Sequence, residues 1–387
     1  MDAKRFSEAS PGRLVRILGN EVAFVPDPLP PRGWEFPADL WPLLAEAKQY
    51  IGQLEGIGSV LQNPTILLRP MGDREAIGSS ALEGTYATPK ELLLFELQPS
   101  EVPESDKTKD HQEVFNYSRA LRHGRSSELP ISLRLIRELH QILLSGVRGR
   151  DKTPGDFRTI QVAIGATRRF VPPPPEVLND CLYPLEGYFH AETSAFDPLV
   201  DCFLVHYQFE TIHPFVDGNG RVGRLLLALM LQQRCGLSKP WLYMSEFFER
   251  HRDEYTDALF SVSATASWTR WIEFCLQGTL EQAKGTIRRC RQLLTLRDEF
   301  SRRVGDVGGS YRLKHIVDDV FDSPLLRIQS VADKLKVSYP TAKSDLDRLV
   351  QAGVVRELPD VFPKTFYAPE IFRVAYGEMS GDVEGVP

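Results

Sequence analysis

Residues 213–236 read HPFVDGNGRVGRLLLALMLQQRCG, a glycine-rich turn that runs directly into an apolar helix. The apolar run predicts a helix over 219–235 that begins near Asn219. Gly218 and Gly220 let backbone N–H groups converge in front of this helix. Free N–H groups and the positive end of the helix dipole together form a site for an anion.

Charged side chains flank this turn in a pattern that suits a polyphosphate. Arg221 and Arg224 are three residues apart and share a helical face, from which planar guanidinium groups can hold phosphate oxygens. Asp217 would repel phosphate unless a cation stood between them, and Mg²⁺ is the usual ion that joins a carboxylate to phosphates. His213 can accept a proton near neutral pH, which suits the general base for an attacking hydroxyl.

Each of these features has a structural alternative when it is taken alone. A His-Pro pair at a helix end is commonly structural, and a Gly-x-Gly before a helix can serve only the sterics of a tight turn. Here a base, a carboxylate, a glycine cradle and two arginines occur within twelve residues. This combination favours a catalytic site for a metal-bound polyphosphate.

The stretch 213–224 resembles the signature of Fic domains, HxFx(D/E)GNGRxxR, and matches it at every specified position. The resemblance covers about residues 37–300 and implies a mainly α-helical Fic-type bundle with a β-hairpin flap. It also implies a protein adenylyltransferase that moves AMP from Mg-ATP to a Ser, Thr or Tyr hydroxyl of a target protein and releases pyrophosphate. The surrounding segments have a similar order: PGDFR at 154–158, FVPPPP at 170–175, an apolar helix with Asp201 and His206, and SEFFERHRDEYTDAL after the motif.

The same resemblance implies a role for each residue of the motif. Tyr255 is the candidate for a contact with adenine, and a buried structural tyrosine is its alternative identity. The resemblance assigns His213 as the base, Asp217 as the ligand of Mg²⁺, Gly218, Asn219 and Gly220 as the anion hole of the α- and β-phosphates, Arg221 as the β-phosphate contact and Arg224 as the γ-phosphate contact.

Upstream, residues 79–84 read SSALEG, which resembles the (S/T)xxxE(G/N) inhibitory motif of the N-terminally inhibited Fic class. If Glu83 reaches Arg224, the guanidinium is neutralised and turned away from the γ-phosphate position. ATP would then bind with its α-phosphate misaligned for attack. Ser79 would help to seat the glutamate, so the resemblance implies an enzyme that is restrained from within its own chain.

Periodicity and composition divide the chain into five parts. Residues 1–36 are proline-rich and predict an irregular strap. An apolar stripe from Leu40 to Ile57 follows it, and then a helix that ends near Gly84. Further helices are predicted over about 109–122, 131–145, 175–190, 196–212, 246–262 and 268–303. The predicted parts are an N-terminal helical region with the inhibitory helix (1–100), the Fic catalytic core (101–304), a linker (305–310), a winged-helix domain (311–375) and a mobile tail (376–387).

The segment TIQVAIGATRRFVPP is rich in β-branched residues and is interrupted by Gly165 and Thr167, which predicts a short β-hairpin at 161–171. It resembles the Fic flap, which would bind the target protein by strand addition and direct its hydroxyl at the base. A surface hairpin that only packs on the core is the alternative.

Residues 311–372 resemble a winged helix, with two helices separated by a break at Val337-Ser338 and followed by a two-stranded wing. DNA readers usually have a basic footprint on the recognition helix, whereas the charges of this helix sum to zero. We therefore favour protein interaction or dimerisation, with DNA binding as the alternative. The helix predicted at 340–352 carries two basic and two acidic residues: Lys343, Arg348, Asp345 and Asp347.

Composition sets the expected compartment. The net charge of −6 provides no global basic field that would draw the chain to nucleic acid or an anionic membrane. Five widely spaced cysteines without a CxxC pair indicate a reducing compartment. No apolar run approaches the ~20 residues of a membrane span, so a cytoplasmic protein with no membrane partner is expected. The apolar helical surfaces favour a homodimer.

Three other functions stay open from the sequence. The Fic body could sense nucleotide without turnover and regulate transcription through the winged helix, although a sensor has no need of His213. The enzyme could also use another diphosphate-containing donor, or run the reverse reaction with Glu83 orienting water. Self-modification is expected beside modification of a separate protein, whose identity the sequence does not define.

Overall fold

The central helix of the fold is α8 (Asn219–Arg234), which begins at the glycine-rich turn as the sequence predicts. Every residue of α8 from Arg221 to Leu231 is buried, because the helix contacts α2, α4, α5 and α7. A bundle of helices therefore surrounds the start of α8. The computed structural model describes residues 1–59, 64–97, 106–147, 152–165, 167–191, 194–308, 311–359 and 361–377.

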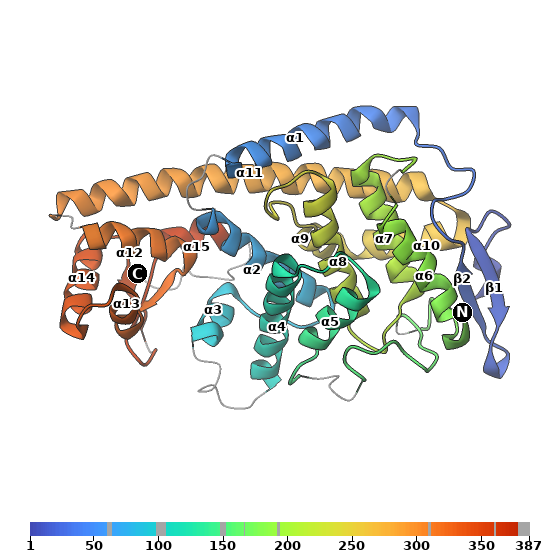
Figure 1. The fold of residues 1–387 in the computed structure, drawn as a ribbon, viewed down its shortest axis with the longest axis horizontal. Coiled ribbons are helices and arrows are strands. Elements are labelled where there is room, and N and C mark those ends of the chain that lie inside the picture. Colours follow the sequence, from blue (N-terminus) through green and yellow to red (C-terminus); the bar gives the residue numbers. More distant parts are fainter. Residues whose placement is uncertain are drawn as a thin grey trace.

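Helices make up most of the chain, and α1 lies along the long helix α11 over one side of the bundle (Figure 1). The helix α11 continues past the bundle to the C-terminal part of the chain (Figure 1). The helices of this region are α1 (Trp41–Ser59), α2 (Thr65–Leu82), α3 (Pro89–Leu97), α4 (Asp106–Ser126), α5 (Leu133–Leu143), α6 (Leu178–Phe189), α7 (Pro198–Ile212), α9 (Ser245–Arg250), α10 (Arg252–Thr265) and α11 (Trp268–Asp306).

The irregular strap predicted for residues 1–36 was wrong in part. β1 (Gly12–Arg16) and β2 (Val22–Pro26) form an antiparallel hairpin. The reason is tertiary packing: Phe24 of β2 is fully buried in an aromatic cluster with Phe6 and Phe170. This packing stabilises the strands although prolines flank them. Among the described residues, short 3₁₀ helices lie at Ala3–Arg5, Leu18–Asn20, Ala38–Leu40 and Pro175–Val177.

One helix was missed, and two predicted elements differ from the structure. The helix α3 was not predicted. The single helix predicted over 246–262 is two helices, because the chain leaves helical geometry at His251, where φ is −113° and ψ is 38°. In place of the hairpin predicted at 161–171, the described residues of this segment form an isolated antiparallel bridge between Ile164 and Phe170. Both of these side chains line a cavity at the start of α8.

The C-terminal part contains four helices and a small sheet in which β3, β5 and β4 are neighbours in that order, all antiparallel. The predicted pair of helices and the two strands of the wing are present, and a third strand, β3, joins them. The elements are α12 (Tyr311–Asp322), β3 (Leu325–Arg327), α13 (Ile328–Leu335), α14 (Tyr339–Gln351), β4 (Arg356–Glu357), β5 (Thr365–Tyr367) and α15 (Pro369–Tyr376).

The boundaries predicted for this part need correction. The helix α11 extends through Asp306, so the predicted linker at 305–310 begins inside a helix. Tyr376, predicted as the first residue of a mobile tail, is fully buried at the end of α15. Residues 378–387, the rest of the predicted tail, lie outside the described residues.

The helix α2 joins the C-terminal part to the bundle. It contacts α4, α8 and α9 on one side and α12 and α15 on the other. Near its middle, the Tyr376 hydroxyl donates to Asp73 Oδ2 at 2.9 Å, and Arg74 Nη1 donates to the carbonyl of Ala375 at 3.0 Å. The last turn of α2 reaches the start of α8.

All five cysteines are free thiols. Within the described ranges, none of the helices combines the length and the apolar character that crossing a bilayer requires.

Candidate active site

The turn between α7 and α8 is held in shape by its own polar groups. Asn219 Oδ1 accepts a hydrogen bond from the N–H of Phe215 at 2.8 Å, and Asn219 Nδ2 donates to the carbonyl of Phe215 at 2.9 Å. Gly218 has a φ of 78°, a left-handed conformation that glycine adopts without strain. As a result, His213 and Gly220 line one cavity from either end of the turn.

His213 is oriented as a proton acceptor. Its Nδ1 lies 3.3 Å from the carbonyl oxygen of Glu210, and because a carbonyl can only accept, Nδ1 carries the proton and Nε2 keeps its lone pair. The guanidinium of Arg158 donates through Nε to the carbonyl of His213 at 2.8 Å and fixes the backbone there. Burial lowers the pKa of His213 to about 4, so its imidazole is neutral at neutral pH.

The start of α8 offers free backbone donors. Among the described residues, no acceptor is found for the N–H groups of Asn219, Gly220 and Arg221, whereas the N–H of Val222 already donates to the carbonyl of Gly218 at 3.0 Å. The side chain of Asn219 is used inside the turn. Asn219 can therefore contribute to an anion site through its backbone, with the helix dipole adding partial positive charge.

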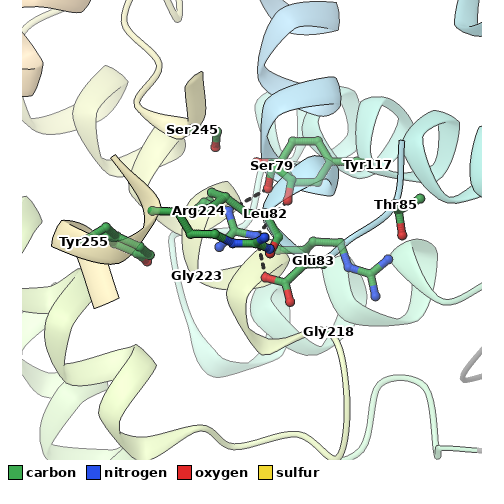
Figure 2. Close-up of polar contacts among 12 residues, drawn as sticks. Ser79, Leu82, Glu83, Thr85, Tyr117, Gly218, Gly223, Arg224, Ser245 and Tyr255 are labelled. Atoms are coloured by element: carbon green, nitrogen blue, oxygen red, sulfur yellow. Dashed lines mark hydrogen bonds and ion pairs between the residues drawn. The ribbon is translucent and has the colours of Figure 1, made fainter. Parts of the chain in front are cut away.

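Arg224 is buried between two groups at the end of α2 (Figure 2). Its Nε donates to Ser79 Oγ at 2.8 Å, and its Nη2 donates to the carbonyl of Ser79 at 2.9 Å and to Glu83 Oε1 at 2.7 Å. Burial opposes the ionisation of Glu83, but Arg224 outweighs it and holds the pKa of this carboxyl below its ordinary value. The predicted contact between Glu83 and Arg224 is thus present as a charged pair.

Glu83 also lies against the anion cradle. A Cβ added at Gly220 would stand 2.2 Å from Glu83 Oε1, which means that the carboxylate oxygen fills the space left by this glycine. Two negative groups cannot share such a place without a large electrostatic cost. An anion bound at the cradle would therefore compete with Glu83.

Arg221 is held by an acid that the sequence did not indicate. Its Nη1 donates to Glu113 Oε2 at 3.0 Å, and both side chains are 5% exposed. The same Glu113 oxygen accepts from Thr85 Oγ1 at 3.0 Å. Of the Arg221 nitrogens, Nε is buried without a partner in the described part of the chain. The contact of Arg221 with a β-phosphate stays a prediction.

Asp217 precedes the cradle and remains accessible. Its side chain is 48% exposed, its Oδ1 accepts from the N–H of Gly218 at 2.6 Å, and Arg221 Nη2 lies 3.8 Å away. A single accessible carboxylate beside a phosphate site fits Mg²⁺, which is held by one or two carboxylates together with substrate phosphates and water. Asp217 would then hold the ion together with the phosphates.

A cavity of about 340 Å³ lies at the start of α8, and its lining includes Glu83, His213, Gly220 and Arg224. Its wall is formed by the end of α2, the segment around Ile164 and Phe170, the end of α7, the start of α8 and one face of α10. Tyr255 of α10 is part of this wall, but its side chain is buried, its hydroxyl lies 2.9 Å from His206 Nε2, and its ring stacks on Phe248. Tyr255 is thus a buried, hydrogen-bonded residue of the cavity wall, and its contact with adenine stays a prediction.

Two further residues, His140 and Arg158, shape the turn. His140 accepts from the N–H of Gly155 through Nδ1 at 2.8 Å, so its Nε2 carries the proton and donates to the carbonyl of Asp217 at 2.9 Å. Arg158 donates to the carbonyls of His213 and Pro173 and so ties the turn to the segment that follows the flap. Arg158 belongs to the quoted PGDFR segment, whereas nothing in the sequence around His140 signals its part.

Comparisons with known proteins agree with this geometry. A model described as the Fic/DOC family N-terminal region matches residues 41–126, and a model described as the Fic/DOC family matches residues 130–231. The chain is 35% identical over 128 residues to a protein of Drosophila virilis named protein adenylyltransferase Fic, and 34% identical over 131 residues to protein adenylyltransferase fic-1 of Caenorhabditis briggsae. Each match covers 32% of this chain and 25% of the relative, so the chain spans about a quarter of the length of these relatives.

Solved structures resemble the fold over a larger part of the chain. A Fic family protein from Desulfovibrio desulfuricans G20 is 21% identical, with a TM-score of 0.57 over 87% of this chain and 97% of that one. Fic-1 from Caenorhabditis elegans is 22% identical, with a TM-score of 0.50 over 65% of this chain and 74% of that one. The predicted mainly helical, Fic-type fold is confirmed.

Proposed function

Since the chain carries the Fic/DOC N-terminal region followed by the Fic/DOC domain and so belongs to this family, we propose that it is an adenylyltransferase that moves AMP from ATP to a protein hydroxyl. The observation that carries the proposal is that a neutral base, His213, and Gly220 line the same cavity. Gly220 is the middle one of three residues, Asn219 to Arg221, whose backbone N–H groups have no acceptor among the described residues. The names of the relatives support the same reaction.

In the proposed reaction, the target hydroxyl gives its proton to His213 Nε2 while its oxygen bonds to the α-phosphorus of ATP. The bond from the α-phosphorus to the oxygen that bridges to the β-phosphate breaks, and pyrophosphate leaves with that oxygen. The free N–H groups at the start of α8 stabilise charge on the phosphate oxygens. Mg²⁺ bound at Asp217 supplies further charge neutralisation on the phosphates when it is present.

We also propose that Glu83 restrains this reaction. The γ-phosphate contact assigned to Arg224 is occupied by Glu83, which accepts from Nη2, and Ser79 accepts from Nε and from the same Nη2. Because Glu83 Oε1 rests against Gly220, its negative charge also opposes phosphate in the cradle. ATP must therefore displace Glu83 or bind with its phosphates out of line.

The target protein is proposed to bind beside the segment 161–171. Ile164, Gly165 and Phe170 of this segment line the cavity, so a chain that adds to its edge would present a side chain close to His213. Ala166 lies outside the described residues. Modification of a second copy of the chain would use the same edge, and the expected homodimer stays a prediction.

For the C-terminal part we propose a winged helix that binds protein in preference to DNA. The order of its elements and its β3-β5-β4 sheet support the winged helix. On α14, Asp345 is buried and accepts from Arg312 Nε at 2.9 Å, so the exposed charges of this helix are Lys343, Asp347 and Arg348. Their sum of one positive charge is small for a DNA reader.

The experiment that tests the function is intact-mass spectrometry of the Glu83→Gly protein after incubation with Mg-ATP. A mass increase equal to one AMP supports the proposal, and its loss on adding His213→Ala supports the role of the base. Binding of ATP without any adduct would favour the nucleotide-sensing regulator. An adduct only with a different nucleotide would identify another donor, and loss of AMP from a modified protein on adding the wild-type chain would reveal the reverse reaction.

A further inference from the structure

A second carboxyl group, that of Glu210, faces the proposed nucleotide cavity and has no role in the reaction described above. Glu210 lies in the last turn of α7, and its side chain forms part of the cavity wall. Its Oε1 is buried and has no hydrogen-bond donor within the described part of the chain. A Cβ added at Gly223 would stand 2.1 Å from this oxygen, so the carboxyl fills the space that Gly223 leaves on α8.

Two charged neighbours of Glu210 have opposite effects on the ionisation of its carboxyl group. Arg224 on the neighbouring α8 favours the ionised form, whereas Glu83 at the end of α2 disfavours it. Burial has the largest effect, and together these influences raise the pKa of Glu210 to about 7. The other ionisable groups of the cavity wall are His213, which is neutral, Tyr255 on α10, Arg252, which donates to the carbonyl of Leu82, and Arg169, which pairs with Asp257.

A bound nucleoside triphosphate would add negative charge near Glu210. A triphosphate that takes the place of Glu83 beside Arg224 brings more negative charge than one carboxylate. An ionised Glu210 would then face phosphate across a cavity whose other two arginines already have partners, Arg252 with the carbonyl of Leu82 and Arg169 with Asp257. One of its oxygens is also buried away from water. Burying an unpaired charge is far more costly than protonating it, and a neutral carboxylic acid can donate a hydrogen bond to an anion.

We propose that Glu210 is a binding residue of this cavity that enters the nucleotide complex as a neutral acid and donates a hydrogen bond to a phosphate oxygen. Binding of nucleotide is then coupled to the uptake of one proton from solvent by the Glu210 carboxyl. No covalent bond changes in this step. The inference rests on the proposed function only in that the cavity receives a nucleoside triphosphate.

The test is calorimetric titration of Mg-ATP into the Glu83→Gly/His213→Ala protein, which should bind without turnover. Titrations at pH 7.5 in buffers of different ionisation enthalpy give the number of protons taken up. We expect Glu210→Gln to lower this number by roughly half a proton to one proton, because the amide cannot titrate. Glu254→Gln on the exposed face of α10 is the matched control and should leave proton uptake unchanged.

Equal proton uptake with and without Glu210→Gln would overturn the inference while leaving the nucleotide site intact. Failure of the Glu83→Gly/His213→Ala protein, which retains Glu210, to bind Mg-ATP would instead overturn the proposed function. If Glu210→Gln does not fold, infrared difference spectra of the protein that retains Glu210 test whether its carboxyl group is protonated in the nucleotide complex. Addition of Mg-ATP should then produce a band of a protonated carboxyl group, and its absence would contradict the proposal.

Discussion

Glu83 Oε1 lies 2.7 Å from Arg224 Nη2, and this pair closes the cavity at the point where α2 ends and α8 begins. Arg224 is almost fully buried, whereas Glu83 is 37% exposed. The acid is therefore the member of the pair that can leave, since its departure exposes only itself. Arg224 remains held by Ser79 through two hydrogen bonds.

Glu83→Gln should raise the affinity for Mg-ATP. The substitution keeps the size of the side chain and removes the charge that ATP must displace from Arg224. Charge-assisted hydrogen bonds contribute about 1.5–3 kcal/mol, so an increase of roughly 10-fold or more is expected. Calorimetry in a His213→Ala background measures it without turnover. Glu254→Gln is the control, and equal affinities for both variants would contradict the restraint.

His213 should be neutral well below its ordinary titration range. Burial lowers its pKa to about 4, so the stability that depends on the neutral ring is present above pH ~6.5 and is lost as the pH falls through about 4. Carbon and nitrogen chemical shifts of the His213 ring, recorded from pH 8 to pH 4, should show the Nδ1–H tautomer throughout most of this range. Titration near pH 6.5 would show that the ring is exposed to water and does not occupy the buried position beside the carbonyl of Glu210.

Tyr376→Phe should destabilise the protein although Tyr376 is distant in sequence from the cavity. Its hydroxyl donates to Asp73 at 2.9 Å, and both side chains are buried. Loss of a buried donor to a carboxyl costs about 1–3 kcal/mol. Urea unfolding measures the change. Tyr311→Phe, at a side chain that is 78% exposed, should alter stability by less than about 0.5 kcal/mol.

Asp73→Asn should change how stability depends on pH. Burial, partly offset by Arg69, raises the pKa of Asp73 to about 7, compared with ~4 in the unfolded chain. The stability that Asp73 contributes is then complete below pH ~4 and is lost as the pH rises through about 7. The asparagine variant should gain relative stability between pH 5 and pH 8 in urea unfolding. A difference that stays constant with pH would mean that Asp73 does not hold a proton in the folded state.

Random duplex DNA should bind weakly to this chain. The exposed charges of α14 sum to one positive charge, so few phosphates can be neutralised there. Fluorescence polarisation at increasing salt should give a shallow slope of log affinity against log salt. A slope that corresponds to six or more phosphate contacts would establish the C-terminal part as a DNA-binding domain.

The part of the site that lies within one stretch of sequence could be predicted. His213, Asp217, the glycines and both arginines follow one another around a single helix start, and their chemistry is local. Glu83 was predicted because its motif has a recognisable order relative to that stretch. The helix α8 was predicted for the same reason, since its apolar run is continuous.

The rest depended on contacts between distant segments. Glu113, His140 and Glu210 act on the turn only because α4, α5 and α7 surround α8, and no spacing in the sequence encodes that arrangement. The β1–β2 hairpin depends on an aromatic cluster that includes Phe170 and Phe260. The sequence gives the four charges of α14, which sum to zero, but not that Asp345 is buried against Arg312 and leaves one positive charge exposed.

The helix α2 has a practical consequence for anyone who trims this chain. Asp73 and Arg74 hold α15, and Glu83 follows ten residues later, roughly 15 Å along the same rigid helix. A shortened protein that stops before Pro369 would lose both hydrogen bonds, Tyr376 to Asp73 and Arg74 to Ala375, that tie α15 to the helix leading to Glu83. Under the proposed restraint by Glu83, such a fragment should have a higher basal rate than the whole chain.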